Sequence, residues 1–392
     1  MTLPFLPYAH QSIDASDIAA VTKALSSDII TRGKEVETFE QGIANYCGAK
    51  FAVAFNSGST ALIAACHAAN VGPSDRILTT PNTFVITAGA GTQLGATPVF
   101  IDIDRQTGNI DLSILEENLD YPSTRGKPVI VPVHFSGIAV DMKRLDTMIK
   151  NPDTIVIEDA SHALGSSYPY GGPKVGSCEW SHMTVFSFHP AKTMTTGEGG
   201  MVLTNDQELQ KRLRSFRDNG IERDSSQFVS SPALPWVYEV HEVTGNYNFT
   251  EFQAALGNSQ LSKLDRFVEK RRSLVEAYRK KLAGFPHLKM FTSSQDSYTA
   301  FHLFVVQIDF SAYKTTKESL VKYLKENQVG TQVHYIPLYR HPHYQKMCGD
   351  IAEYFPQTEA YYSQALSLPL FFDMEIGDVE RVVGLLKRFF RR

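Results

Sequence analysis

The chain has 392 residues, of which 43% are apolar, so it can bury a sizeable core and is expected to form one large and one small domain. Its 38 basic and 42 acidic residues are mixed along the whole length, and the formal net charge of −4 leaves no basic stripe for nucleic acid. No apolar run approaches roughly 18 residues and the N-terminus shows no secretory pattern, so neither a membrane span nor secretion is expected.

Cysteine and histidine spacing gives no sign of a disulfide framework or a metal centre. The four cysteines are scattered without paired spacing, which is typical of reduced thiols in a cytoplasmic protein. Three histidines cluster late in the chain, but no cysteine or carboxylate lies among them at ligand spacing, so no metal site is predicted. The residues concerned are Cys47, Cys66, Cys178 and Cys348, and His334, His341 and His343.

The N-terminal part predicts an arm and two helices. The arm contains Tyr8 and leads to a helix start at Asp14 or Ser16, from which the helix extends to residue 25. A glycine-containing break follows. A second helix fits residues 36–46 because their apolar side chains share one helical face.

A strand, a sharp turn and an alanine-rich helix are predicted at residues 51–55, 56–58 and 59–69. A turn with hydroxyls and glycine at a helix start presents free backbone N–H groups and the positive end of the helix dipole, which together suit an anion. A plain helix cap by Ser57 or Ser59 explains the same residues equally well. This segment alone leaves both interpretations open.

From here strand-like and helix-like segments alternate, which favours a mostly parallel sheet covered on both faces. Ligands bind such sheets at the loops that follow strand ends, where segments 81–84, 134–137 and 158–162 and the one around Lys192 lie. The expected strands are residues 76–80, 97–103, 128–134, 154–158, 184–188 and 201–204, and the expected helices are residues 83–94, 112–119, 142–149 and 207–219.

Two carboxylates follow the apolar strand at 154–158. The pair Glu158 and Asp159 is costly at the end of a central strand unless a positive group compensates it. Successive strand residues face opposite sides of a sheet. We therefore assign Glu158 to a structural contact and Asp159 to the opposite face, with a cationic partner.

A lone lysine lies between two strand-like runs. Lys192 follows the run at 182–188 and precedes the run at 201–204, within a segment rich in hydroxyls and glycines. Such a lysine is either a solvated loop charge or a nucleophile whose pKa has been lowered for carbonyl chemistry. Most lysines are exposed, so the rest of the chain has to decide.

The second half of the chain predicts a connector and a compact α+β domain. A polar, serine-rich stretch to residue 235 is expected to be mobile or to contact a second subunit. A helix from 250 to 282, with room for one break, suits a connector between domains. We place a large domain with its arm at 1–250 and the connector with the small domain at 251–392. The expected elements of the small domain are strands at 303–308 and 332–336 and helices at 317–326, 358–365 and 378–390.

Together, these strand ends supply the groups that pyridoxal phosphate (PLP) needs. Its phosphate needs N–H and hydroxyl donors, as offered by segment 57–60 and by Ser187, and its aldehyde needs a lysine such as Lys192 for a Schiff base. Its ring nitrogen needs a carboxylate, as in Asp159, in order to stay protonated. Its ring face needs an aromatic lid, which Phe84 can provide.

Seven segments carry a resemblance to a known family, and the most specific is Ser187-Phe188-His189-Pro190-Ala191-Lys192. The others are residues 56–62, 81–84, 96–100, 158–165, 195–200 and 250–257. In these segments, and over nearly its whole length, the chain resembles the DegT-type sugar-nucleotide aminotransferases, which are fold-type I PLP enzymes. The resemblance implies an α/β fold with a mostly parallel central sheet in the large domain and a smaller C-terminal α+β domain.

The resemblance also implies roles for individual residues. Lys192 would form the Schiff base with PLP and then carry a proton between the sugar C4 and the cofactor C4′. Asp159 would pair with the pyridine N–H, Phe84 would stack on the ring, and His162 would lie near the phenolic oxygen. Asn246 would reach the phosphate from the neighbouring subunit, so the active site would be shared across a homodimer. The other phosphate contacts would be Gly58, Ser59, Thr60 and Ser187.

Within the family, segments 107–111 and 330–337 look most like the branch that makes UDP-4-amino-4,6-dideoxy-N-acetyl-β-L-altrosamine, a precursor of pseudaminic acid. This implies L-glutamate as the amino donor and a UDP-linked 4-keto-6-deoxy-N-acetylhexosamine as the acceptor. A dTDP-sugar or a UDP-pentose is the alternative acceptor. A non-catalytic regulator that binds nucleotide sugars would be expected to lack Lys192 or Asp159, and the related pyridoxamine-dependent dehydratases carry histidine in place of Lys192.

Some positions depart from the family pattern. The arginine of a common Gly-Tyr-Asn-Tyr-Arg run is Asn248 here, and Ile138 stands where glutamine is frequent, so the substrate contacts of this chain can differ. Ser59-Thr60 replaces Thr-Ala, which conserves a hydroxyl. Four residues are further candidates for substrate contact: Tyr8, Arg32, His134 and His334. A structural role for the two histidines and a surface position for the arginine remain equally open.

Overall fold

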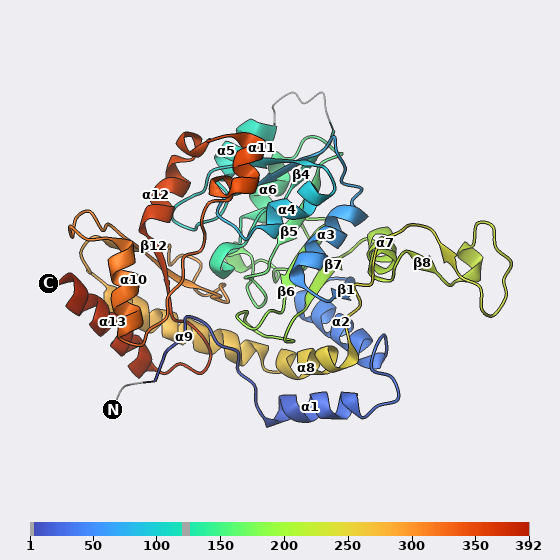
Figure 1. The fold of residues 1–392 in the computed structure, drawn as a ribbon, viewed down its shortest axis with the longest axis horizontal. Helices are drawn as coiled ribbons and strands as arrows, with labels where there is room; N and C mark the ends of the chain where they lie inside the picture. The colour runs from blue at the N-terminus through green and yellow to red at the C-terminus, as the bar shows by residue number, and fades with distance from the viewer. Residues whose placement is uncertain (1–3, 120–125, 392) are drawn as a thin grey trace.

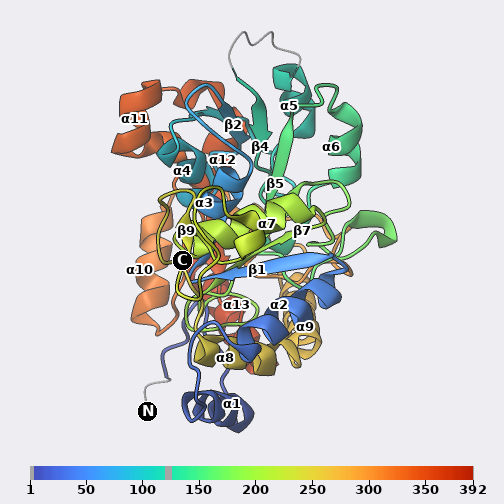
Figure 2. The ribbon, with the colours of Figure 1, turned by 90° about the vertical axis from the view of Figure 1, so that its right-hand side faces the viewer.

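The computed structural model describes residues 4–119 and 126–391. Its main feature is a seven-stranded sheet in the order β1-β7-β6-β5-β4-β2-β3, seen at the centre of Figure 2. Six strands run in the same direction and β7 alone runs opposite, so the expected mostly parallel sheet is confirmed. The strands are β1 (Phe51–Phe55), β2 (Arg76–Thr79), β3 (Thr97–Phe100), β4 (Pro128–Ile130), β5 (Ile155–Asp159), β6 (Met183–Ser187) and β7 (Gly200–Thr204).

Both faces of this sheet are buried because its strands are apolar at consecutive positions. In β1, Ala54 belongs to the hydrophobic cluster on one face and Val53 to the cluster on the other. The helices α2 (Lys34–Cys47), α5 (Leu112–Leu119) and α6 (Met142–Met148) cover the first face. The helices α3 (Gly58–Ala68), α4 (Ile86–Gln93) and α7 (Gln207–Arg217) cover the second, and all six lie within a turn of the ranges expected from the sequence.

The N-terminal helix α1 (Ala15–Leu25) packs against α8 (Glu251–Leu261) at the lower edge of Figure 1. Asp14 caps α1 as expected, and its side chain accepts the N–H of Ser16 and of Asp17. A carboxylate from α8 holds the start of α2: Glu251 accepts the N–H groups of Gly33, Glu35 and Val36. Charge and hydrogen bonding thus tie the N-terminal helices to the connector.

The connector consists of α8 and α9 (Leu264–Leu282), with the break that the sequence allowed. The helix α9 spans two hydrophobic clusters, because Phe267 packs with the large sheet and Leu274 with a second cluster. The second cluster is built on an antiparallel sheet in the order β10-β11-β12. Its elements and their neighbours are β10 (Leu288–Met290), β11 (Phe304–Ile308), β12 (Ala365–Leu368), α10 (Lys317–Glu326), α11 (Pro342–Cys348), α12 (Pro356–Gln364) and α13 (Ile376–Phe390).

The division of the chain at residues 250 and 251 stays a prediction. The arm residue Leu6 packs in the second cluster although it belongs to the first 250 residues. Its N–H donates to Gln328 O (2.9 Å) and its carbonyl accepts the N–H of Gly330 (2.8 Å). The N-terminal arm therefore joins the C-terminal cluster to the large sheet.

The prediction of a strand at residues 332–336 is wrong. Gln332 makes a single bridge to Ser367, and the N–H of Tyr335 donates to Asn82 Oδ1 (3.1 Å), which belongs to the large-sheet side. The segment therefore crosses between the two sheets and cannot pair as a strand along its length. The high β-propensity of its valine, tyrosine and isoleucine is overridden by these tertiary contacts.

Several predicted boundaries also needed correction. The strands expected at 97–103 and 128–134 end earlier, as β3 and β4. The helix expected at 358–365 ends at Gln364 because Ala365 begins β12, which pairs with β11.

Residues 219–245 form a projecting hairpin, seen at the right of Figure 1, with the short strands β8 (Ile221–Glu222) and β9 (Glu239–Val240). Its tip is held by Glu239, whose carboxylate accepts the N–H groups of Val229, Ser230 and Ser231. Large apolar side chains point into solvent along it: Val229 is 83%, Trp236 75% and Val243 95% exposed. Such exposure on an ordered extension is typical of a surface that another molecule covers.

Within residues 4–119 and 126–391, no helix is both long and apolar enough to span a bilayer.

Candidate active site

A cavity of about 610 Å³ opens at the carboxyl ends of β5 and β6, facing the segment 332–336. Among the described residues, its wall contains most of those predicted from the sequence: Tyr8, Gly58, Ser59, Phe84, Asp159, His162, Ser187, Lys192 and His334. Four predicted residues lie outside that wall: Arg32, Thr60, His134 and Asn246.

Lys192 lies on the connection between β6 and β7. Its N–H donates to His189 O (2.8 Å), and His189 Nδ1 accepts the N–H of Ala191 (3.2 Å), so local hydrogen bonds fix the turn. Burial lowers the pKa of the Lys192 amine to about 8, while the nearby Asp159 carboxylate acts in the opposite direction. A substantial fraction of this amine is therefore neutral slightly above neutral pH, as a nucleophile for a carbonyl requires.

Asp159 ends β5 and is 4% exposed. Its Oδ2 accepts the hydroxyl of Thr87 on α4 (2.6 Å) and its Oδ1 accepts the N–H of Ser161 (3.1 Å). These two donors fix the orientation of the carboxylate within the cavity wall. A carboxylate whose two oxygens are fixed in this way is suited to a strong, directional hydrogen bond with a positively charged donor in the cavity.

Glu158 and His134 form a separate buried pair. His134 Nε2 lies 2.7 Å from Glu158 Oε2, and the hydroxyl of Tyr168 donates to the same oxygen (2.5 Å). His134 Nδ1 accepts the N–H of Val140 (3.0 Å), so its proton is on Nε2, facing the carboxylate. The opposite placement of Glu158 and Asp159 agrees with the prediction. His134 has the structural role that the sequence left open, and we assign it no substrate contact.

The start of α3 combines a helix cap with an open cavity wall. The hydroxyl of Ser57 accepts the N–H of Thr60 (3.1 Å), and the hydroxyl of Thr60 donates to Asn56 Oδ1 (2.8 Å), away from the cavity. A Cβ at Gly58 would lie only 2.8 Å from Cβ of Ser187. Glycine therefore lets the Ser187 hydroxyl approach the first turn of α3, where free N–H groups and the dipole favour an anion.

Burial lowers the pKa of three histidines of the wall, His162, His302 and His334, so these three are neutral near pH 7. Burial, followed by the positive charge of Lys192, holds the pKa of His162 well below its usual range. The Nδ1 of His162 accepts the N–H of Ser136 (3.3 Å), so its Nε2 carries the proton and faces the Tyr335 hydroxyl (3.1 Å). Burial and Lys192 also lower the pKa of His334 to about 3. Its Nδ1 is 2.8 Å from Ser367 Oγ.

Tyr335 and His302 are among the wall residues that the sequence analysis missed. Tyr335 follows His334 directly, and it was missed because the segment 332–336 was wrongly predicted to be a strand. His302 lies before β11, with its ring centroid 4.3 Å from that of His162. The rule that ligands bind at carboxyl ends of strands does not apply to a residue at the amino end of a strand in the smaller sheet.

Asn246 and Arg32 are both exposed, and Asn246 follows directly after the projecting hairpin. Asn246 Oδ1 accepts the side-chain amide of Asn248 (2.8 Å). Arg32 follows Thr31, which bridges Thr250, and has a left-handed backbone with φ 52°. Neither residue lines the cavity of its own chain. For metal binding, the described part of the chain holds no group of three or more His, Cys, Asp or Glu side chains with suitable placement.

The wall suits a flat ring that bears a phosphate and an aldehyde. A helix start and the Ser187 hydroxyl are placed for the phosphate, and Lys192 supplies an amine for the aldehyde. Asp159 offers an oriented carboxylate to a ring nitrogen, and Phe84 lines the same cavity with an aromatic face. The close approach that only glycine at position 58 permits is part of this fit.

Comparisons with known proteins agree with this chemistry. The spore coat polysaccharide biosynthesis protein SpsC of Bacillus subtilis is 38% identical over 384 residues, 98% of this chain and 96% of that protein. The UDP-4-amino-4,6-dideoxy-N-acetyl-β-L-altrosamine transaminase of Campylobacter jejuni is 36% identical over 381 residues, 97% of this chain and 96% of that protein.

Solved structures confirm the fold. PseC of Helicobacter pylori, an aminotransferase involved in the biosynthesis of pseudoaminic acid, has a TM-score of 0.88 and 29% identity over 99% of both chains. The PMP form of the sugar aminotransferase Spr1654 of Streptococcus pneumoniae has a TM-score of 0.88 and 25% identity, covering 98% of this chain and 99% of that one. The model of the DegT/DnrJ/EryC1/StrS aminotransferase family matches residues 11–387. The chain therefore belongs to the DegT/DnrJ/EryC1/StrS aminotransferase family and is a PLP-dependent enzyme with the fold-type I architecture.

Proposed function

We propose that this enzyme transfers the amino group of L-glutamate to C4 of a UDP-linked 4-keto-6-deoxy-N-acetylhexosamine, in a pathway of the pseudaminic acid type. The observation that carries the reaction class is the convergence of Lys192, Asp159 and the start of α3 on one cavity. The substrate is supported by the Campylobacter transaminase and by PseC, both similar to this chain over nearly its whole length.

Each wall residue has a defined task in this proposal. When bound, PLP supplies an electron sink that lets a proton leave the carbon bearing the nitrogen. Lys192 would hold the cofactor covalently and, once released by the substrate, would move that proton as a general base. Asp159 would keep the ring nitrogen protonated, and Phe84 would cover the ring face. The N–H groups of Gly58 and Ser59 and the Ser187 hydroxyl would bind the phosphate.

The phenolic oxygen of the cofactor would lie close to His162 and its partner Tyr335. One of these two side chains would donate a neutral hydrogen bond to that oxygen. The lowered pKa of His162 keeps this contact uncharged over the physiological range. Tyr8 and His334, whose ring centroids are 5.7 Å apart, form the part of the wall that would face the sugar nucleotide.

The substrate is tested with a panel of keto sugars linked to UDP and dTDP, each incubated with L-glutamate and read by mass spectrometry. We expect the UDP-linked 4-keto-N-acetylhexosamine to give a product in which an amino group replaces the keto oxygen at C4. Conversion of a dTDP-sugar or a UDP-pentose in its place would overturn the proposed substrate while keeping the reaction class. Binding of nucleotide sugars with no amino transfer from any donor would favour a non-catalytic regulator.

Replacing Gly58 with alanine should weaken cofactor binding by about tenfold or more, which corresponds to about 1.4 kcal/mol. The new methyl group would lie 2.8 Å from Cβ of Ser187 and 3.0 Å from its Oγ, and would push that hydroxyl away from the helix start. The measurement is a titration of apoenzyme with PLP, followed by visible absorption. Gly72→Ala is the matched control, because no atom lies within 4 Å of a Cβ there. Equal PLP affinity in both variants would contradict the assignment of Gly58 to the phosphate site.

We further propose a homodimer in which Asn246 reaches the active site of the other copy. The support is the exposure of Asn246 outside its own cavity, next to the apolar surface of the projecting hairpin. Helix α1 adds a second exposed apolar strip, since Ile18 is 61% and Leu25 is 55% exposed. These surfaces are of the kind that a second copy buries.

Val243→Asp should convert the dimer to a monomer and abolish most activity, because Val243 is 95% exposed and a buried, unpaired carboxylate would oppose association. Light scattering coupled to gel filtration measures the mass. Tyr354→Asp is the control, since Tyr354 is 68% exposed and lies far along the chain from the projecting hairpin. A dimer that survives in Val243→Asp would place the interface elsewhere.

A mixing experiment tests whether the active site is shared. Lys192→Ala and Asn246→Ala are each expected to be impaired as homodimers. If Asn246 serves the other copy, each mixed dimer has one site that carries both defects and one intact site. Random exchange of subunits should then restore about a quarter of the wild-type activity, since about half the dimers are mixed. No recovery after verified exchange would show that Asn246 does not act across the interface.

A further inference from the structure

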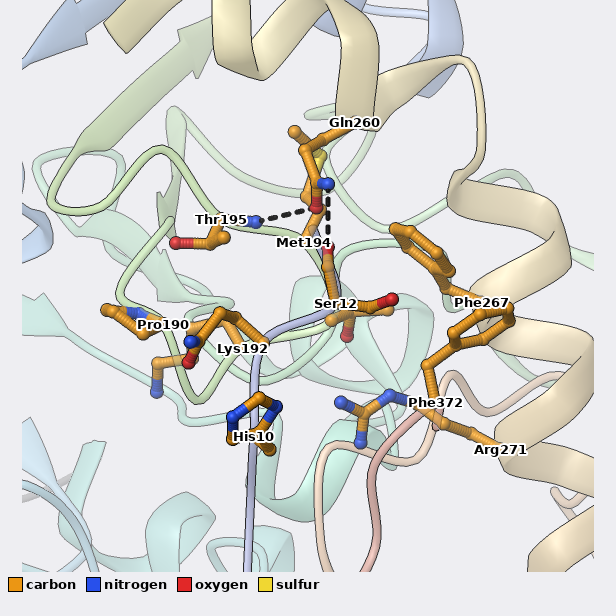
Figure 3. A pocket seen from close by; sticks show the side chains of 12 residues that line it. His10, Ser12, Pro190, Lys192, Met194, Thr195, Gln260, Phe267, Arg271 and Phe372 are labelled. Atoms are coloured by element: carbon orange, nitrogen blue, oxygen red, sulfur yellow. Dashed lines mark hydrogen bonds between the residues drawn. The ribbon is translucent and has the colours of Figure 1, made fainter. Parts of the chain in front are cut away.

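Gln260 on α8 is 1% exposed, and each end of its carboxamide has a partner. Its Oε1 accepts the N–H of Thr195 over a long 3.4 Å, three residues after Lys192. Its Nε2 donates to Ser12 O (2.9 Å) and to Asp17 Oδ2 (2.8 Å), both in the N-terminal part of the chain. Figure 3 shows the carboxamide between Thr195 and Ser12, beside a small cavity that Lys192 also lines.

The orientation of this carboxamide is dictated by its partners. The carbonyl of Ser12 and the carboxylate of Asp17 can only accept hydrogen bonds, so both face the amino end of Gln260. The N–H of Thr195 can only donate, so it faces the oxygen. If the amide were turned the other way, its oxygen would face the two acceptors, Ser12 O and Asp17 Oδ2. Its NH2 group would then face the N–H donor of Thr195.

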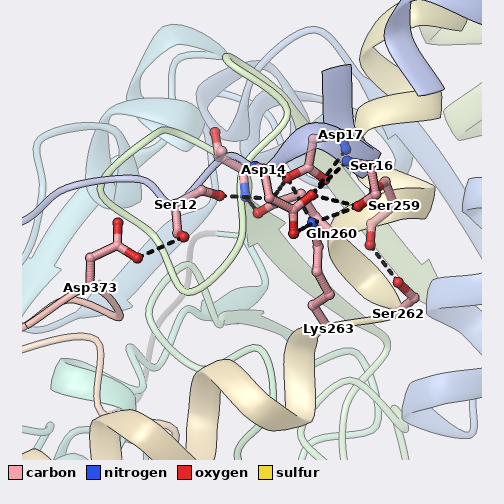
Figure 4. A network of polar contacts seen from close by, with 10 residues as sticks. Ser12, Asp14, Ser16, Asp17, Ser259, Gln260, Ser262, Lys263 and Asp373 are labelled. Carbon is pink, nitrogen blue, oxygen red and sulfur yellow. Dashed lines mark hydrogen bonds and ion pairs between the residues drawn. The ribbon is translucent and has the colours of Figure 1, made fainter. Parts of the chain in front are cut away.

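Asp17 anchors the amino end firmly. Its side chain is fully buried, and its Oδ2 accepts Lys263 Nζ (2.7 Å), Gln260 Nε2 and the N–H of Asp14 (3.0 Å). Burial would raise the pKa of this carboxyl, but the hydrogen bonds, led by that from Lys263, lower it overall and keep it charged. Figure 4 shows these groups gathered around Gln260, with Ser12 linked in turn to Asp373.

The arm that Gln260 holds also forms part of the active-site wall. Tyr8 lines the large cavity, and its carbonyl accepts the N–H of Leu370 (3.0 Å). Further along, the hydroxyl of Ser12 donates to Asp373 Oδ1 (2.9 Å). Between these contacts the arm passes the turn that carries Lys192, and Gln260 is the side chain that hydrogen-bonds to both segments.

A second glutamine provides an internal comparison. Gln253 lies seven residues before Gln260, two turns earlier on the same face of α8. Its Nε2 donates to Glu198 O (2.8 Å), at the far end of the Lys192 turn, and its Oε1 accepts the N–H of Thr250 (3.2 Å). Gln253 therefore holds the Lys192 turn without touching the arm.

We propose that Gln260 is a positioning residue that couples the N-terminal arm to the Lys192 turn, so that Tyr8 and Lys192 keep a fixed relation within one cavity. The side chain touches neither group directly and acts through Ser12, Asp17 and Thr195. Its kinetic consequences rest on the proposed function, whereas the coupling itself is a property of the folded chain.

Hydrogen exchange followed by mass spectrometry on the full-length enzyme tests the coupling at peptides covering residues 5–14 and 193–199. Gln260→Met keeps the size but removes both polar ends, so exchange should accelerate at least about tenfold in both peptides. Gln260→Glu, at pH 8, keeps an acceptor for Thr195 but has no donor, so only the arm peptide should accelerate. Gln253→Leu should accelerate only the 193–199 peptide. Gln41→Leu, on the exposed face of α2, is the control and should change neither.

The proposal is overturned if both Gln260 variants leave the arm peptide at the wild-type rate, or if exchange rises uniformly over the whole chain, as in general destabilisation. The kinetic counterpart separates KM from kcat. Gln260→Glu should raise the KM for the sugar nucleotide about tenfold with little change in kcat, and Gln260→Met should lower kcat as well. If no sugar nucleotide is a substrate, the proposed function fails and the exchange result still decides the role of Gln260.

Discussion

Lys192→Ala is expected to lower the rate of amino transfer by at least about 10³-fold, or about 4 kcal/mol in activation free energy. In the proposed mechanism the variant lacks both the covalent anchor and the base that moves the proton. The visible absorption band of lysine-bound PLP should disappear, although the cofactor would still bind through the proposed phosphate contacts at Gly58, Ser59 and Ser187. Stopped-flow absorption and product analysis measure the two effects separately.

The loss should not reflect unfolding. Among the described residues the amine of Lys192 makes no hydrogen bond, so its removal breaks no polar contact. Lys211→Ala, on the surface of α7 where Lys211 pairs with Glu208 at 3.8 Å, is the control and should leave activity unchanged. A Lys192→Ala enzyme that retains the band and more than a tenth of the activity would rule out Lys192 as the anchor.

Asp159→Asn is expected to cost about 10³-fold in rate while leaving the shape of the site intact. The amide oxygen can still accept the N–H of Ser161, and the amide NH2 can donate to the Thr87 hydroxyl, which can turn to accept it. The neutral amide would not, however, hold the ring nitrogen of the cofactor protonated. The substitution also changes the pH dependence of PLP uptake. Only the neutral amine adds to an aldehyde, so uptake by wild-type apoenzyme should rise as the pH passes through about 8.

The sign of the shift in the variant follows from the two causes at Lys192. Burial lowers the pKa of Lys192 and the negative charge of Asp159 raises it, so neutralising position 159 should move the midpoint to lower pH. The midpoint of PLP uptake is found from the rate at which the absorption band appears, recorded from about pH 6 to 10. This range of about four pH units covers a shift in either direction. Asp153→Asn, at an exposed position, should leave it unchanged. A midpoint that rises in Asp159→Asn would contradict the pairing of these two residues.

The sequence was most informative where local pattern and global fold agree. The strands around Asp159 and Ser187 are buried on both faces, and their mostly apolar runs made the strand ends, and hence the cavity wall, predictable. The start of α3 was recognised from its turn residues. What spacing could not give was the direction of the Thr60 hydroxyl, which depends on Asn56 four residues earlier.

The residues that were missed or misplaced depend on contacts between distant segments. The segment 332–336 has the composition of a strand, yet Tyr335 donates its N–H to Asn82, which follows β2 of the large sheet. His302 meets His162 only because the two sheets face one another across the site. The seven-residue spacing places Gln260 on the same face of α8 as Gln253. Its hydrogen-bond partners Ser12 and Thr195 are remote in sequence, so spacing alone does not reveal them. Such pairings need the folded chain.

One strand limits how the site can vary. Gly200 begins β7 and pairs with Phe55 on one side and with Ser187 on the other, and a Cβ at this position would lie 2.3 Å from Ser57 O. A slip of β7 that brings Met201 into that space is sterically blocked. A slip the other way brings Gly199 there without a clash but exchanges the buried side chains of the two faces of β7, so the packing opposes it. An insertion or deletion between residues 188 and 199 therefore cannot be absorbed by the sheet. It would change the reach of Lys192 into the cavity while the start of α3 stays in place, which makes the length of this loop an independent variable for adapting the enzyme to acceptors of different size.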